Sequence, residues 1–426
     1  MENVGDSVGH EPCARNVLIF YIFIFEHLFG NASTKDFQFY WNVPTYMCHR
    51  YGIQFEEVSR DFGIIQNPRD EFRGEKIAIL YDPGMFPALL HHPDGKNKKN
   101  QFKKHKKIIG RNHNGKKIYM YIYICIAQCL GELRKRNGGV PQEGDLNRHL
   151  EVFRTHLSEQ ITNESFSGVG IIDFESWRPI FRQNWASLDP YRVLSVKLEK
   201  ERHPLWSAQA VKKEAVKRFE KWGRIFMEET LKAAKTLRPQ ATWGYYAYPY
   251  CFNLTPQRLN SVCDRQVFTE NNEMSWLFGA ENVLLPSVYL QKSLTDREKV
   301  GLINGRVSEA MRISRRSSPR TKVLPYFWYK YQDERDFLLS REDMVNGFRE
   351  IVDLAADGVI IWGSSNDLNS SAKCQKFREY LKDILGPAVA EAKGMAKQRV
   401  SNDENAESVQ QETELPTSSI STRHTR

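Results

Sequence analysis

Two carboxylic acids, Asp173 and Glu175, follow an aliphatic run and are the strongest chemical signal in the sequence. The run Val169-Gly-Ile-Ile172 predicts a buried strand, and residues i and i+2 of a strand point to one side. Two carboxyl groups held close in a partly dry site resist ionising together, so one keeps its proton near neutral pH. The leaving oxygen of a glycosidic bond needs such a protonated acid. The alternatives are a surface pair, or a metal-binding pair without its other ligands.

Seven short β-rich runs alternate with helix-length stretches, which predicts parallel strands and an α/β fold. The runs open with aliphatic residues and close with Tyr, Trp, Asp, Glu or Ser, and active sites of β/α barrels lie at the C-terminal strand ends. We therefore expect a distorted TIM-like (β/α) barrel with about seven parallel strands. An open doubly wound sheet is the alternative, although no Gly-rich phosphate loop follows the first strand. The runs are 39–44, 76–81, 169–175, 242–249, 284–290, 323–329 and 358–364, and the clearest helix is 211–237.

The formal charge of +9 comes from one segment. Residues 96–117 contain nine Lys, one Arg and no acid, and the rest of the chain is close to neutral. A basic patch confined to one low-complexity stretch is not a folded binding face. We therefore expect no nucleic-acid partner.

Residues 95–135 interrupt the alternation of strands and helices. About 40 residues without clear structure are unusual inside a compact domain. The segment can be a surface insertion, a membrane-associating loop or translated intron sequence. We favour the intron, because the flanks His92-Pro-Asp-Gly95 and Arg136-Asn-Gly-Gly-Val-Pro141 resemble one interrupted loop.

The two ends of the chain are predicted to lie outside the barrel, which spans 35–392. Residues 1–34 contain a nine-residue apolar run, 17–25, followed by small residues. This pattern indicates a secretory signal cleaved near Ala32 and is too short to span a bilayer, so we expect a secreted protein without stable membrane insertion. An N-terminal apolar helix is the alternative. The polar tail 393–426 is predicted to be disordered.

Four of the seven cysteines, Cys48, Cys251, Cys263 and Cys374, lie outside the signal-like segment and the insert. An even number suits two disulfides in an oxidising compartment, and three pairings are open. Glycosylation sequons agree with secretion; besides Asn31, they occur at Asn163, Asn253 and Asn369.

Several long motifs together resemble the hyaluronidase family of glycoside hydrolases, and its insect venom members in particular. The resemblance covers about 37–94 and 136–392. Its motifs are Asp173-Phe-Glu-Ser-Trp-Arg-Pro179, Tyr40-Trp-Asn-Val-Pro44, Tyr81-Asp-Pro-Gly84, Trp362-Gly-Ser-Ser365, Gly244-Tyr-Tyr-Ala-Tyr-Pro249, Phe86 and the stretch 326–331.

The resemblance implies an endo-acting hydrolase that cleaves β-1,4 bonds after N-acetylglucosamine in hyaluronan, or in chondroitin, without metal or cofactor. Glu175 would be the acid and then the base, while Asp173 would hold the substrate acetamido group, whose oxygen attacks the sugar. Tyr289 would bind the acetamido oxygen and Trp362 would pack on the sugar. The residues implied to line the groove are Tyr81, Arg178, Tyr246, Ser364 and Ser365, with Arg178 equally able to orient a carboxylate.

The family also implies which cysteines pair and which other functions compete. It implies the disulfides Cys48–Cys374 and Cys251–Cys263. A chitinase-like hydrolase uses the same acetamido chemistry, but its longer acidic run is absent, since Gly170 and Ile171 occupy the upstream positions. A catalytically inactive glycosaminoglycan-binding protein is the other alternative, and it would not need Glu175.

Overall fold

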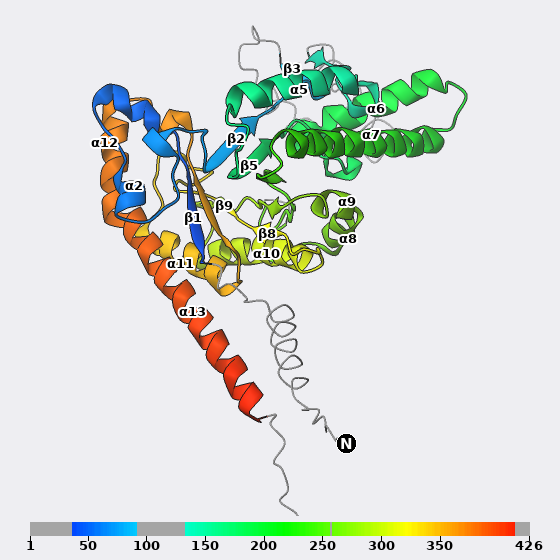
Figure 1. The fold of residues 1–426 in the computed structure, drawn as a ribbon. Coiled ribbons are helices and arrows are strands. Elements are labelled where there is room, and N and C mark those ends of the chain that lie inside the picture. Colours follow the sequence, from blue (N-terminus) through cyan, green and yellow to red (C-terminus); the bar gives the residue numbers. More distant parts are fainter. Residues whose placement is uncertain (1–35, 92–132, 256–257, 414–426) are drawn as a thin grey trace, which may run out of the picture. The chain divides into compact units, whose positions relative to one another are not determined.

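The computed structural model describes residues 36–91, 133–255 and 258–413, with side chains as far as Asn402 (Figure 1). The signal-like segment, Cys13, Cys125, Cys129, the Asn31 sequon, most of the insert and the end of the tail lie outside the described residues. The compact unit that contains the site spans Gln38–Met395. No helix in the described ranges is long and apolar enough to cross a membrane.

Parallel strands form the predicted barrel. Pairing gives the strand sets β1-β10-β9, β2-β5-β6 and β7-β8, and β1 lies against β2. Two parallel bridges, Tyr246–Leu285 and Ser287–Tyr326, connect β6 to the chain after β7 and that chain to β9. The strands are β1 Gln38–Asn42, β2 Ile77–Tyr81, β5 Val169–Asp173, β6 Thr242–Tyr245, β7 Val283–Leu284, β8 Lys322–Val323, β9 Tyr326–Trp328 and β10 Gly358–Trp362.

The two predicted strands that contain proline are shorter than expected. The run 284–290 is a strand only at β7, and the run 323–329 divides into β8 and β9. Pro286 and Pro325 lie at these interruptions, and proline cannot donate to a strand ladder. Near the prolines, the isolated bridges given above connect neighbouring segments in the order expected for a barrel.

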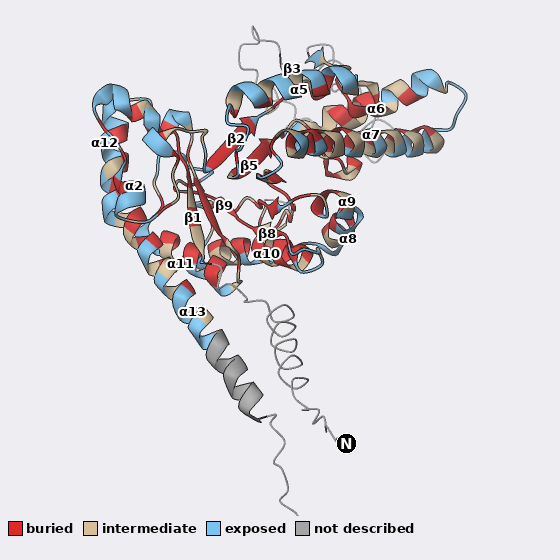
Figure 2. Ribbon diagram, in the orientation of Figure 1, coloured by how far each residue is buried: buried red, intermediate tan, exposed pale blue. Residues whose placement is uncertain are grey.

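Helices follow the strands around the barrel, and their burial pattern is drawn in Figure 2. The predicted helix 211–237 is confirmed as α7, which is capped by the Ser207 side chain and ends at Leu237. Thr295 and Glu298 form a capping box at the start of α10. The helices are α2 Glu57–Arg60, α5 Leu146–Gln160, α6 Asp189–Arg202, α7 Ala208–Leu237, α8 Arg265–Glu273, α9 Ser275–Phe278, α10 Asp296–Ser314, α11 Arg341–Asp353, α12 Ser371–Tyr380 and α13 Gly386–Thr413.

Helix α13 changes the expectation for the tail. We expected disorder from residue 393, but α13 continues to Thr413. Val389 and Ala392 are buried at its start, so the helix begins on the core and its hydrogen-bonded ladder continues into the polar sequence.

Both disulfides implied by the resemblance are present, as Cys48–Cys374 and Cys251–Cys263. The glycosylation prediction is wrong for Asn253 in this fold. Its side chain is 1% exposed, its amide donates to the carbonyls of Ser261 and Leu302, and its oxygen accepts from Arg306. Sequon spacing does not show burial. Asn163 and Asn369 are exposed and stay predictions.

An antiparallel hairpin that the sequence did not predict encloses the insert. Strand β3, Ala88–His91, pairs with β4, Leu133–Arg136, and His91 lies opposite Leu133. Residues 133–135, which we assigned to the insert, therefore belong to the fold. The chain leaves and re-enters the described structure at paired positions.

Deleting residues 96–132 should leave the barrel folded. The remaining His92-Pro-Asp-Gly95 would join paired strand ends, and four-residue hairpin loops are common. We expect an unchanged far-ultraviolet circular dichroism spectrum and a nearly unchanged Tm. A fall of more than about 10 °C, several kcal/mol for a domain of this size, would show that the segment stabilises the fold.

Candidate active site

The C-terminal strand ends place the two predicted acids and Tyr81 together. Tyr81 ends β2 opposite Asp173, which ends β5, and the N–H of Asp82 donates to the carbonyl of Asp173 over 2.7 Å. The next residue, Phe174, is buried, with its ring centroid 4.0 Å from that of Phe86. The side chain between the two acids thus packs outside the site, as the i, i+2 alternation predicts.

Aromatic side chains from other strand ends join Tyr81. The indole N–H of Trp362, at the end of β10, donates to the Tyr81 hydroxyl over 2.9 Å. The Tyr289 ring stacks on Trp362 with centroids 5.5 Å apart, and its centroid lies 6.4 Å from that of Tyr246. Tyr246 in turn donates to the Ser287 hydroxyl over 3.2 Å. Tyr81, Tyr246, Tyr289 and Trp362 therefore form one connected wall.

The electrostatics of the acid pair differ from our expectation in one respect. Burial, the charge of Glu175 and the charge of Asp82 raise the pKa of Asp173 to about 8. Burial also raises the pKa of Glu175, while the charge of Arg178 lowers it. We expected Glu175 to keep the shared proton, but the stronger rise falls on Asp173, because Glu175 reaches solvent and has a cation nearby.

The two serines predicted for the groove lie just beyond β10. The Ser364 side chain accepts from the N–H of Asn366 over 3.3 Å and caps the short helix Ser365–Leu368. Ser365 is exposed. The structure therefore gives Ser364 a capping role, and substrate contact of either hydroxyl stays a prediction.

Arg178 lies in the loop after Glu175. Its Nη1 donates to the Gln183 carbonyl over 2.7 Å, and its backbone N–H donates to Asn184 over 2.8 Å. Its charge lowers the pKa of Glu175. Both predicted roles of Arg178, substrate contact and orientation of a carboxylate, stay predictions.

An ion pair next to the acids was not predicted from the sequence. Both terminal nitrogens of Arg136 bind the Asp82 carboxylate, at 2.5 and 2.8 Å, and Nε donates to the Phe86 carbonyl. Asp82 follows directly after a strand end, which is a usable signal. Arg136 lies 54 residues away and could not be paired with it from sequence.

Two histidines of α5 hold the loop that follows Tyr81. His149 accepts from the N–H of Met85 over 3.0 Å, and His156 accepts from that of Gly84 over 3.1 Å. Burial lowers the pKa of His149 to about 3, so its ring is neutral and can accept. The loop is thus fixed by side chains of a helix outside the barrel.

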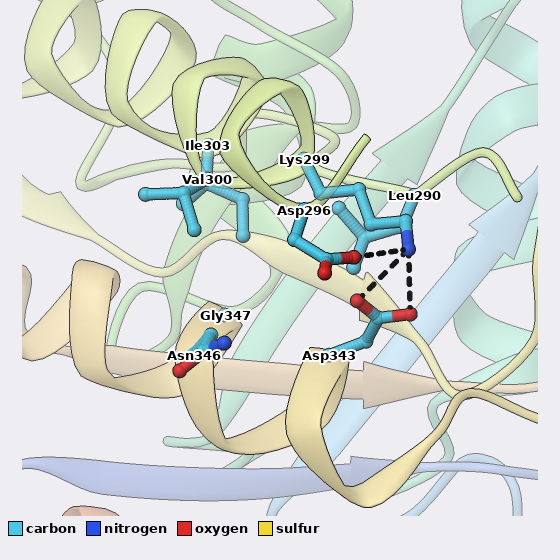
Figure 3. Close-up of a pocket in the computed structure, with 8 residues that line it drawn as sticks. All are labelled: Leu290, Asp296, Lys299, Val300, Ile303, Asp343, Asn346 and Gly347. Atoms are coloured by element: carbon cyan, nitrogen blue, oxygen red, sulfur yellow. Dashed lines mark hydrogen bonds and ion pairs between the residues drawn. The ribbon is translucent and has the colours of Figure 1, made fainter. Parts of the chain in front are cut away.

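A separate hollow of about 180 Å³, which includes open solvent, lies beside α10 and α11 (Figure 3). Lys299 points toward Asp296 and Asp343 there and binds them at 3.1 and 3.0 Å. None of the predicted site residues lines it. Asp296 and Asp343 form ion pairs with Lys299. The hollow therefore has no acid pair that could share a proton, as Asp173 and Glu175 can.

Replacing Asp173 with Asn should stabilise the protein relative to wild type, and the difference should grow as the pH rises. A pKa raised from 3.8 to about 8 means that Asp173 opposes folding increasingly between these pH values. We expect the stability of the variant relative to wild type to increase between pH 4.5 and 8.5, by on the order of a few kcal/mol. The Tm of both proteins in matched buffers measures this difference. Asp336→Asn, on an exposed acid, is the control. A difference in Tm between Asp173→Asn and wild type that does not change with pH would contradict the raised pKa of Asp173.

Known proteins are similar to this chain in sequence and architecture. A family model described as hyaluronidase matches residues 121–407. A hyaluronidase of Apis mellifera is 56% identical over 361 residues, 84% of this chain and 85% of that protein. A crystal structure of bee venom hyaluronidase in complex with a hyaluronic acid tetramer superposes with a TM-score of 0.74 at 57% identity, covering 83% of this chain and 98% of that one. An inactive hyaluronidase B of Vespula vulgaris is 40% identical over 83% of this chain and 93% of that protein. The chain thus belongs to the hyaluronidase family of glycoside hydrolases, with a TIM-like barrel.

Proposed function

We propose that this protein is an endo-acting hydrolase of hyaluronan that cleaves the β-1,4 bond after N-acetylglucosamine. The observation that carries the proposal is the acid pair at the end of β5, where burial and mutual charge oppose double ionisation. The connected wall of Tyr81, Tyr289 and Trp362 beside it supplies flat surfaces for a sugar ring.

In the proposed first step, the acetamido oxygen of the substrate attacks the anomeric carbon. Glu175 gives its proton to the departing glycosidic oxygen as the bond between that oxygen and the carbon breaks. In the second step, water attacks the same carbon, Glu175 takes a proton from it, and the bond to the acetamido oxygen opens. The configuration is retained without a carboxylate nucleophile, one of the exceptions to the two-carboxylate scheme.

Asp173 would hold the acetamido group in place for this attack. Whether or not it carries a proton, a carboxyl group retains an oxygen that can accept from the acetamido N–H. Tyr289, buried apart from 7% of its surface, would donate to the acetamido oxygen, and Trp362 would pack against the methyl group. Fixing the internal nucleophile close to the carbon lowers the entropy cost of the reaction.

Two alternatives are tested by the same substrates. A chitinase-like hydrolase would cleave chitin, and a glycosaminoglycan-binding protein would bind hyaluronan without cleaving it. The relative named as inactive shows that similarity of this degree does not by itself establish turnover. The intact pair of Asp173 and Glu175 favours an active enzyme, because binding alone does not need a proton donor.

We further propose that the protein is secreted. The signal-like run 17–25 and the two disulfides support an oxidising, extracellular compartment. Hyaluronan or a related glycosaminoglycan would be its partner there.

Glu175→Gln should remove nearly all hydrolysis of hyaluronan while leaving the fold intact. Loss of a general acid costs about 10²–10⁴-fold, and Tyr289→Phe should cost about 10²-fold through the lost donor. Purified wild type and variants are incubated with hyaluronan, chondroitin and chitin, and the products are sized. Glu164→Gln, on an exposed residue, is the matched control. Wild-type rates in Glu175→Gln would overturn the assignment, and cleavage of chitin alone would favour the chitinase-like alternative.

A further inference from the structure

Three aromatic rings surround the Arg178 guanidinium, and the roles proposed above use none of them. The central carbon of the guanidinium lies 4.7 Å from the ring centroid of Tyr250, 5.0 Å from that of Phe252 and 5.7 Å from that of Trp185. Tyr250 and Phe252 stack on each other with an interplanar angle of 6°. We call Trp185, Tyr250 and Phe252 the aromatic cage. The negative faces of such rings attract a cation.

The aromatic cage takes the place of an ion-pair partner for Arg178. No described residue forms an ion pair with it, and its Nε is buried without a hydrogen-bond partner. A partly buried cation without an anion bonded directly to it is costly. The Gln183 carbonyl, a side-chain hydrogen bond with Tyr250 and the three ring faces therefore hold the guanidinium in place.

The charge held in this way acts on Glu175. The titratable groups whose charges interact with Glu175 come from several elements: Tyr81 of β2, Asp173 of β5, Arg178 of the following loop, and Tyr246 and Tyr250 after β6. Arg178 is the cation in this set, and it favours the ionised form of the acid.

We propose that Trp185, Tyr250 and Phe252 are positioning residues, which hold the Arg178 guanidinium in a fixed place in the loop that follows Glu175. The charge held there influences the pH range in which Glu175 carries a proton. This inference rests on the proposed function for its catalytic meaning. The electrostatic claim itself concerns the free protein.

The fold holds the cage in place from two sides. Tyr250 and Phe252 flank Cys251, which is bonded to Cys263. On the other side, Arg182 and Gln183 both bind the Glu270 carboxylate of α8, which fixes the loop that carries Trp185. The local disulfide and this carboxylate anchor therefore bring two separate loops together around one cation.

The test compares single variants that remove a ring face with one that keeps it. Phe252→Leu and Trp185→Leu each remove a face, Tyr250→Phe keeps the face and removes the hydrogen bond between the hydroxyl and Arg178, and Arg178→Met removes the charge. Phe268→Leu is the matched control, because Arg312 lies over that ring at 5.4 Å in another part of the fold. Folding of each variant is checked by circular dichroism and by the presence of both disulfides.

The primary readout is the Glu175 pKa from ¹³C nuclear magnetic resonance of glutamate-labelled protein, with the signal assigned by its loss in Glu175→Gln. We expect Arg178→Met to raise this pKa by about 1 unit or more, and each folded Leu variant to raise it by a smaller amount. Phe268→Leu should match wild type, and Tyr250→Phe, which keeps the ring face, should change the pKa less than either Leu variant. The alkaline limb of the pH profile of kcat/KM on hyaluronan should move upward in the same order.

The outcomes separate this inference from the proposed function. If the folded Leu variants keep the wild-type pKa of Glu175 and only lower kcat, the cage is structural and the inference is wrong. If the pKa rises as expected while wild type does not cleave hyaluronan, the cage is supported and the proposed function fails. Failure of both Leu variants to fold leaves Arg178→Met as the decisive comparison, since an unchanged pKa there also overturns the inference.

Discussion

Mutual repulsion and burial of two carboxyl groups at the end of one strand are what the rest of the site depends on. An isolated Asp and Glu are both ionised at neutral pH. In the barrel mouth, burial raises the pKa of both Asp173 and Glu175, and the charge of Glu175 raises that of Asp173 further, while the charge of Arg178 lowers that of Glu175. A carboxyl group that keeps its proton at a pH at which the same group in water is ionised can donate that proton to an ether oxygen.

The barrel produces this arrangement through strand register and through side chains far from the acids. Register between β2 and β5 places Tyr81 opposite Asp173. On the other edge of β5, Gly170 leaves room for the Trp243 ring of β6, because a Cβ at Gly170 would lie 2.5 Å from that ring. The loop after β2 depends on His149 and His156 of α5. The environment of the acids therefore depends on contacts distributed over several elements.

Much of the architecture could be predicted from the sequence, because period and strand-end chemistry are local signals. The pair on β5, the alternation of strands and helices, and α7 all follow from patterns within a few residues. The burial of Asn253, the Asp82–Arg136 ion pair and the hairpin β3–β4 could not be predicted, because each depends on residues distant in sequence. The order of the two pKa values also needed the structure, since exposure of Glu175 and the position of Arg178 decide it. Family resemblance supplied the disulfide pairing and the role of Tyr289, which residue spacing alone left open.

Infrared spectroscopy of the carboxyl groups tests the central claim most directly. Wild type minus Asp173→Asn difference spectra, recorded from pH 5 to 9, should show the carbonyl stretch of a protonated carboxylic acid at neutral pH, and the band should disappear as the pH passes about 8. If the band is already absent at pH 6, both acids ionise like ordinary surface carboxylates. That result would contradict the claim that the barrel mouth keeps a proton on the pair.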